Sequence, residues 1–186
     1  REKGETTEVN LYRLAEFPPR LTPLGGTTEL EAGRAGYTTV ILNPENRRVA
    51  FGTTGTNGAL AVLKWTGETP EPEQVTLEPL DLYYGQHVIL QAFSPDSRYL
   101  AVEIRSTAGT DRVEVYQVDE KNRLNFNLEQ AFPVGEYNVS FRQWEPDSKA
   151  FLIRVSPGVQ ATGDEAKMGT WRINVQTGER EKVVGG

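Results

Sequence analysis

One five-residue phrase with proline at its second position occurs three times along the chain at a constant spacing. The copies begin at Asn43, Ser94 and Glu145, so that each lies 51 residues after the one before. They read Asn43-Pro44-Glu45-Asn46-Arg47, Ser94-Pro95-Asp96-Ser97-Arg98 and Glu145-Pro146-Asp147-Ser148-Lys149. Two equal intervals indicate a repeated structural unit, and a unit of this length is typical of solenoids and propellers.

Each copy of the phrase fits a tight turn between two strands. Proline presets the backbone angle φ of the first central turn position, and the acidic residue and the Asn or Ser after it can bond the local backbone. An apolar run precedes each phrase and a second run follows it, as in the pair Ile89–Phe93 and Tyr99–Ile104. The repeated unit therefore begins with a β-hairpin.

Two further β-rich runs complete each unit. The third runs are 60–65, 113–118 and 171–175, and the shorter fourth runs are 74–77, 124–128 and 181–184. A four-stranded antiparallel unit repeated every 40 to 50 residues is the pattern of a β-propeller blade. The prediction is an all-β fold, one propeller-like domain over residues 1–186. Its expected parts are three complete blades, at about 37–79, 87–132 and 138–184, and an N-terminal half-blade at 8–24. The alternative is an ordinary β-sandwich, which leaves the equal intervals unexplained.

The phrase also resembles a known repeat. Phe93-Ser94-Pro95-Asp96-Ser97-Arg98-Tyr99-Leu100-Ala101 is similar to the blade repeat of the TolB-type and prolyl-oligopeptidase-type propellers, relatives of the WD-repeat blades. That family usually has glycine where Ser97 and Ser148 stand, and the first copy, Leu42-Asn43-Pro44-Glu45, is looser. The resemblance covers residues 37–184. It implies the fold, whereas propellers of one fold serve many functions.

The strands do not add up to a closed ring. The N-terminal segment offers a third-type strand at 9–14 and a fourth-type strand at 20–24, giving three blades and half of another, whereas closed propellers use four to eight blades. Three explanations stay open: a part of a larger propeller, an open arc whose edges are covered, or a ring completed by a second copy or another partner.

Composition excludes several functions. Twenty Lys and Arg against 26 Asp and Glu give a net charge of −6, and no basic cluster suited to a nucleic acid occurs. No apolar run is long enough to span a bilayer. The chain has no Cys and one His, which removes thiol chemistry and most zinc and copper sites, so we expect no metal and no cofactor. No nucleophile-elbow phrase accompanies His87, and the expectation is a protein that is not an enzyme.

The candidate binding residues lie in loops expected at one end of the blades. Loops on a rigid scaffold can vary freely and commonly carry binding sites. A segment of unusual length, 156–169, is either functional or flexible, and His87 follows a Gly in a position that favours a packing role. The predicted loop-face residues are Tyr83, Tyr84, His87, Asp111, Gln160, Asp164, Glu165 and Lys167.

These observations lead to two main hypotheses on function. The first is a non-enzymatic module that presents its loop face to a protein or peptide partner, with an extracytoplasmic location implied by the family resemblance. The alternative is the gating, substrate-selecting propeller of a larger hydrolase whose catalytic domain lies outside these residues. A third hypothesis, a sugar or small-ligand binder that uses the central channel, also stays open.

Overall fold

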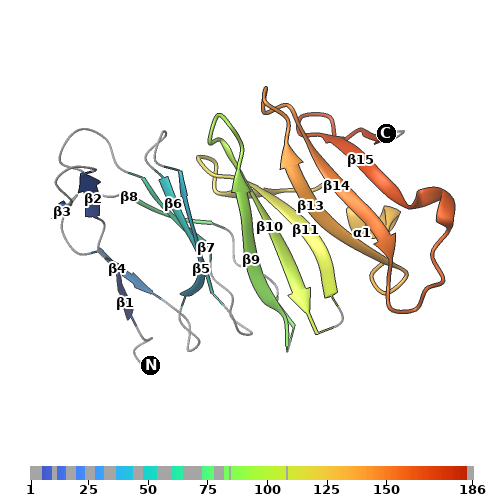
Figure 1. Ribbon diagram of the computed structural model, residues 1–186, viewed down its shortest axis with the longest axis horizontal. Coiled ribbons are helices and arrows are strands. Elements are labelled where there is room, and N and C mark those ends of the chain that lie inside the picture. The colour runs from blue at the N-terminus through green and yellow to red at the C-terminus, as the bar shows by residue number, and fades with distance from the viewer. Residues whose placement is uncertain are drawn as a thin grey trace.

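The protein consists almost entirely of antiparallel β-strands (Figure 1). The computed structural model describes residues 6–9, 12–15, 20–23, 28–31, 37–43, 48–53, 60–64, 73–77, 82–83, 85–107 and 109–183. The first group of strands is β1 (Thr6–Val9), β2 (Tyr12–Ala15), β3 (Arg20–Pro23) and β4 (Thr28–Glu31). The others are β5 (Tyr37–Asn43), β6 (Arg48–Thr53), β7 (Leu60–Lys64), β8 (Glu73–Thr76), β9 (His87–Phe93), β10 (Tyr99–Ser106), β11 (Gly109–Gln117), β12 (Asn122–Leu124), β13 (Tyr137–Trp144), β14 (Ala150–Pro157), β15 (Gly169–Asn174) and β16 (Arg180–Val183). The helices are α1 (Leu128–Ala131) and the 3-10 turn η1 (Glu165–Lys167).

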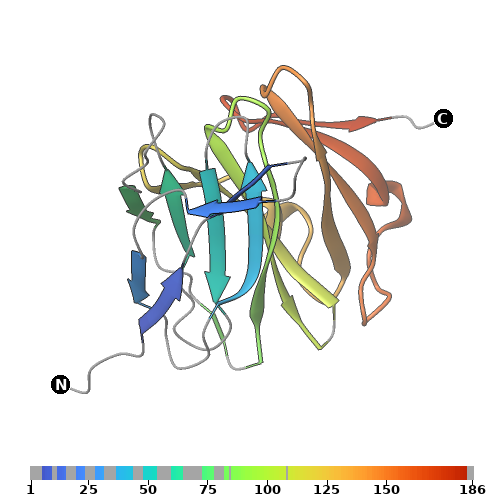
Figure 2. The same ribbon diagram turned by 60° about the vertical axis from the view of Figure 1, so that its left-hand side comes forward.

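Twelve of these strands form three four-stranded sheets in which neighbours in sequence are neighbours in space. We call β5–β8 the first sheet, β9–β12 the second and β13–β16 the third. All pairs within them are antiparallel, which confirms the predicted all-β class and the four strands per repeat. Figures 1 and 2 show the three sheets in a row. A propeller built from these sheets, with the domain boundaries given above, stays a prediction.

The N-terminal strands form two antiparallel pairs, and the half-blade expected at 8–24 stays a prediction. Residues 9–14 were expected to form one strand, but Val9 ends β1, which pairs with β4, whereas β2 begins at Tyr12 and pairs with β3. The prediction of a single strand here is wrong. The two pairs form separate two-stranded sheets.

The second sheet departs from the repeat after Leu124. Its fourth strand was expected at 124–128, but β12 occupies Asn122–Leu124 and is followed by α1. Asn127 adopts the left-handed conformation at φ 51°, which asparagine tolerates better than most residues. The chain thereby leaves the sheet edge, and Phe126 and Leu128 become buried in the core.

Two apolar cores join the sheets in succession. One packs Ala50 and Val62 of the first sheet against Leu100 and Val102 of the second. The other packs the second sheet against the third around Phe151, which is fully buried and lies 5.4 Å, ring to ring, from Trp144. The central strand β10 of the second sheet is accordingly buried along six successive residues, as expected of a strand covered on both faces.

The repeat is visible in backbone detail as well as in strand order. In β9 and β13 one residue has no partner in the register, Gln91 and Arg142, and these bulges are 51 positions apart. The turn residues Ser97 and Ser148 both have positive φ, 58° and 60°. Glycine adopts this conformation most easily, so serine at these two positions needs a compensating contact.

The two turn serines compensate for their strained backbone with bonds that glycine cannot make. Ser97 Oγ accepts a hydrogen bond from Asn43 Nδ2 at 2.7 Å, across to the first sheet. Ser148 Oγ accepts one from the Asp96 backbone N–H at 3.0 Å, across to the second. Hydroxyl groups therefore tie the end of β5 and the turns of the second and third sheets together in succession.

Replacing Ser148 tests this balance. We expect Ser148→Ala to lower the free energy of unfolding by about 1–3 kcal/mol, because the Asp96 N–H loses its acceptor while the unfavourable φ remains. Ser148→Gly loses the same bond but relieves the backbone, so it is expected to be about 1 kcal/mol more stable than the alanine variant. Urea denaturation monitored by tryptophan fluorescence measures both; equal stability of the two variants contradicts the assignment.

Candidate functional site

The loops of the second and third sheets lie together at the end of the sheets opposite the hairpin turns, in the lower part of Figure 1. The two sets meet where Gly109, which opens β11, lies against Asn138 near the start of β13. A Cβ placed on Gly109 would be 3.2 Å from Asn138 Nδ2. We call this surface the loop edge, and it comprises residues 82–83, 85–87, 106–107, 109–111, 133–137 and 157–168.

On the second sheet a cluster of hydrogen bonds fixes the loop before β9. The Tyr83 backbone N–H donates to Gln86 Oε1 at 2.9 Å, and Gln86 N–H donates back to the Tyr83 carbonyl at 3.0 Å. Gln86 Nε2 donates to Asp111 Oδ2 at 2.6 Å, while Ser106 Oγ donates to Asp111 Oδ1 at 2.8 Å. Both carboxylate oxygens of Asp111 therefore hold the loop, and Tyr83, 74% exposed, extends from a fixed base.

His87 follows Gln86 and is the first residue of β9. Its backbone pairs with Arg105, and its side chain is partly buried. The packing role expected for His87 stays a prediction. Tyr84, the other aromatic predicted here, lies outside the described residues.

On the third sheet the long loop is folded back on the start of β13. Gly158 N–H donates to the Glu136 carbonyl and Gln160 N–H to the Gly135 carbonyl, both at 2.9 Å. A Cβ on Gly158 would lie 2.2 Å from the Gly135 carbonyl oxygen, so glycine is required for this close approach. The loop between β14 and β15 is thus an ordered part of the surface.

Side chains fix the far half of the same loop. The Tyr137 hydroxyl accepts the Asp164 N–H at 2.7 Å, and Asp164 Oδ1 accepts the Ala166 N–H at 2.9 Å. Lys167 Nζ donates to the Ala131 carbonyl at 3.2 Å and lies 5.6 Å from the centroid of the Tyr137 ring. Asp164 and Lys167, two predicted binding residues, therefore hold the loop, whereas Glu165 and Gln160 are exposed.

Three exposed apolar or aromatic side chains stand on this fixed framework. Val159 is 68% exposed and Val134 is 50% exposed, and both flank the backbone pairing of Gly158–Gln160 with Gly135–Glu136. Tyr83 is the third. Sequence reasoning identified Tyr83 but missed Val134 and Val159, because an apolar residue in a sequence is first read as core and only the folded loop shows that these two face outward.

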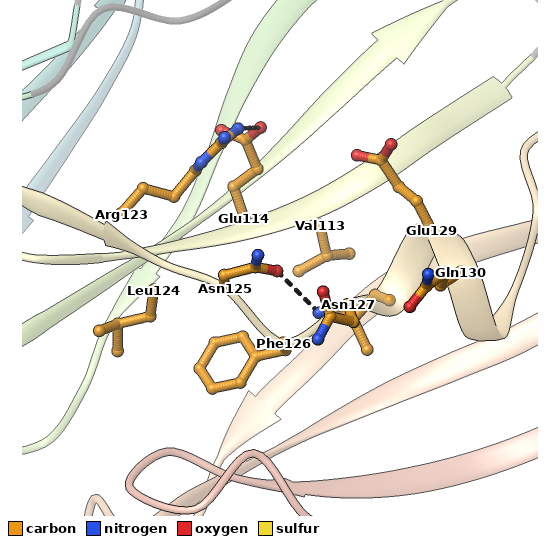
Figure 3. A pocket seen from close by; sticks show the side chains of 10 residues that line it. Val113, Glu114, Arg123, Leu124, Asn125, Phe126, Asn127, Glu129 and Gln130 are labelled. Carbon is orange, nitrogen blue, oxygen red and sulfur yellow. Dashed lines mark hydrogen bonds and ion pairs between the residues drawn. The ribbon is translucent and has the colours of Figure 1, made fainter.

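A separate pocket of about 290 Å³ lies beside the segment that leaves the second sheet. Figure 3 shows Arg123 and Glu114 on one side of it and Asn125, Phe126 and Asn127 below. Glu114 is buried and accepts hydrogen bonds, each 2.7 Å long, from Arg112 Nε, Arg123 Nη1 and the Tyr116 hydroxyl. Sequence reasoning did not identify this network, since nothing in the alternation of β11 marks Glu114 as buried.

Burial and hydrogen bonding have opposite effects on the Glu114 carboxyl. Burial raises its pKa, but the hydrogen bonds from Tyr116 and Arg112 and the positive charges of Arg112 and Arg123 outweigh burial, so that the pKa lies below the ordinary 4.5. Burial and the adjacent Glu114 raise the pKa of Tyr116 well above its usual range. Glu114 is therefore a charged structural group with all its near partners in place.

The described part of the chain contains no group of three or more His, Asp or Glu residues placed to hold a metal ion. Within the same residues, no helix has the length and apolar character needed to cross a membrane.

Comparisons with known proteins give matches among solved structures but none by sequence. Neither a protein-family model nor a curated protein matches the sequence. Among solved structures, the crystal structure of TolB from Acinetobacter baumannii is similar, with a TM-score of 0.46 and 12% identity over 93% of this chain. The chain spans about 40% of the length of that structure. A similarity of this size does not place the chain in a family.

Proposed function

We propose that this protein is a non-enzymatic binding module that presents the loop edge to a protein or peptide partner. One observation carries the proposal: Tyr83, Val134 and Val159 are exposed on loops that hydrogen bonds hold in place. Apolar side chains held out from an ordered surface in this way can be buried against a partner, and that burial would favour binding.

The fixed base of these loops favours binding. A loop that is already ordered loses little conformational freedom when a partner docks, so more of the contact energy appears as affinity. Aromatic and apolar anchors surrounded by polar groups are the usual arrangement of a protein interface. Here the exposed Gln160 and Glu165 provide polar neighbours in the same loop as Val159.

The test compares partner capture by matched baits. The wild-type chain and the variant Tyr83→Ala/Val134→Asp/Val159→Asp are immobilised, and the proteins that each retains are quantified by mass spectrometry. The control bait is Glu120→Ala/Lys121→Ala, in a turn of the second sheet outside the loop edge. We expect at least one protein that the wild type and the control retain equally and that the loop-edge variant loses by tenfold or more.

The captured protein is then produced alone and its dissociation constant is measured by calorimetry against the same three chains. If every retained protein binds the loop-edge variant as well as the wild type, the loop edge is not the interface and the proposal is overturned. An extracytoplasmic location and completion of the ring by a partner remain proposals drawn from the turn phrase and the strand count.

A further inference from the structure

The third sheet stands at one end of the row of sheets and turns one of its faces away from the second sheet (Figure 1). Its inward residues include Phe141, Ile153 and Val155, all buried in the core shared with the second sheet. The alternate positions lie on the other face, which we call the outer face. Two cross-strand rows of paired residues on it are Ser140–Arg154–Thr170 and Gln143–Leu152–Arg172.

The repeat allows this face to be compared with the face by which the second sheet packs on the third. In the second sheet Glu103 pairs with Val113, and the equivalent pair in the third sheet is Arg154 with Thr170. Likewise the pair Ala101 and Val115 corresponds to Leu152 and Arg172. Val113 and Val115 contribute to the apolar core. On the outer face Thr170 and Arg172 thus replace the two valines that help to stack the second sheet on the third, while Leu152 remains apolar.

The same comparison shows a reversal of charge. Glu103 Oε1 accepts a hydrogen bond from the Phe141 backbone N–H of the third sheet at 2.7 Å. Arg154 occupies the equivalent position, and its side chain is positively charged. A further sheet that docked in the manner of the third would meet a guanidinium where the second sheet offers a carboxylate.

The cations of the outer face are not all neutralised. Arg172 is held by Glu145 through two bonds, from Nε at 2.7 Å and from Nη2 at 2.8 Å. Arg142, the bulge residue of β13, and Arg154 are exposed, and neither forms an ion pair in the part of the chain that the structure describes. Two guanidinium groups on adjacent strands therefore stand ready for an anionic partner in a chain whose net charge is −6.

We propose that the outer face of the third sheet binds an acidic, extended segment of a partner protein through Arg142 and Arg154. A guanidinium matches a carboxylate with two parallel hydrogen bonds. In an extended segment every second side chain points to the same side, about 6.6–6.8 Å apart, so alternating acids present a row of carboxylates. Ser140, Gln143 and Thr170 supply further hydrogen-bonding groups. A nucleic acid is disfavoured by the overall negative charge.

The probe is a fluorescein-labelled peptide of four Glu-Ser repeats, and its neutral control has four Gln-Ser repeats. Fluorescence anisotropy is measured with the full chain at 50 and 150 mM salt. We expect saturable binding of the acidic peptide, weaker at the higher salt, and binding of the neutral peptide at least tenfold weaker. Arg142→Glu/Arg154→Glu is expected to weaken binding of the acidic peptide by at least tenfold.

A matched control separates this face from general charge effects. Arg98→Glu/Lys121→Glu makes the same change in net charge at two exposed sites of the second sheet and is expected to change the dissociation constant by less than twofold. If charge reversal perturbs folding, the variant Arg142→Gln/Arg154→Gln removes the two positive charges without adding negative ones, and its affinity for the acidic peptide is measured instead. Absence of binding to the wild type, equal losses in both charge-reversal variants, or equal binding of the neutral peptide each overturns the proposal.

Discussion

Replacing Glu103 with alanine is expected to lower the free energy of unfolding by about 2–4 kcal/mol, because a buried carboxylate that accepts hydrogen bonds from the third sheet and from the half-exposed Arg105 is lost. Glu103 is 1% exposed. Its Oε1 accepts the Phe141 N–H of the third sheet at 2.7 Å, and its Oε2 accepts Arg105 Nε at 2.8 Å and Nη2 at 2.6 Å. Truncation leaves a buried backbone donor without a partner and weakens the junction between two sheets.

A graded pair of variants distinguishes this network from simple loss of volume. Glu103→Gln keeps an oxygen for the Phe141 N–H but removes the charge that holds Arg105, and we expect it to cost about 1–2 kcal/mol. Glu120→Ala, an exposed acid in a turn, is the control and should cost less than about 0.5 kcal/mol. Urea denaturation followed by circular dichroism measures all three. If Glu103→Ala is no less stable than Glu120→Ala, the proposed role of Glu103 is contradicted.

The strand order was predictable because its signals are local. The phrase Ser94-Pro95-Asp96-Ser97 contains its own turn chemistry, and Ser94 Oγ, Asp96 and the Tyr99 N–H bond one another within five residues. The apolar runs on either side then have few ways to pair. Three hairpins at a constant spacing therefore predict three sheets.

The departures from prediction arise where distant contacts outweigh local pattern. Residues 124–128 read as a strand, but burial of Phe126 against Phe151, with ring centroids 5.3 Å apart, draws this segment out of the sheet. The exposure of Val159 depends on the pairing of its loop with Gly135, 24 positions earlier. Neither of these two contacts can be inferred from the local sequence.

The candidate site was predictable only in its location. Loops at one end of the sheets were expected, and Tyr83 is exposed there as predicted. The parts played by the polar residues were not foreseen, since Asp111 and Asp164 hold their own loops. Sequence identifies a polar loop residue, but only the folded chain shows whether its hydrogen bonds are already used within the protein.

Replacing Glu114 with alanine is expected to lower the free energy of unfolding by about 2–4 kcal/mol, because the buried Arg112 and Tyr116 side chains each lose a hydrogen-bond acceptor. Arg112 is 9% exposed and the Tyr116 hydroxyl belongs to a side chain that is 1% exposed. Both donate to Glu114 at 2.7 Å. Arg112 keeps the longer ion pair with Glu129, 3.7 Å away, but loses its short bond, and the buried Tyr116 hydroxyl loses its acceptor, so the loss exceeds that of one ordinary hydrogen bond. Urea denaturation at pH 7 gives this value, with Glu120→Ala again as the exposed control.

Glu114 should also make the free energy of unfolding depend on pH, and a second variant measures its contribution to that dependence. Its pKa in the folded chain lies below the ordinary 4.5, so between the two values the unfolded chain binds more protons and stability rises with pH. The contribution is complete above about pH 4.5 and is lost as the pH falls through the lowered folded pKa. Glu114→Gln, which does not titrate, should therefore show a shallower fall in unfolding free energy from pH 5 to 3 than the wild type. Parallel curves for the two chains over this range would contradict a lowered pKa of Glu114 in the folded chain.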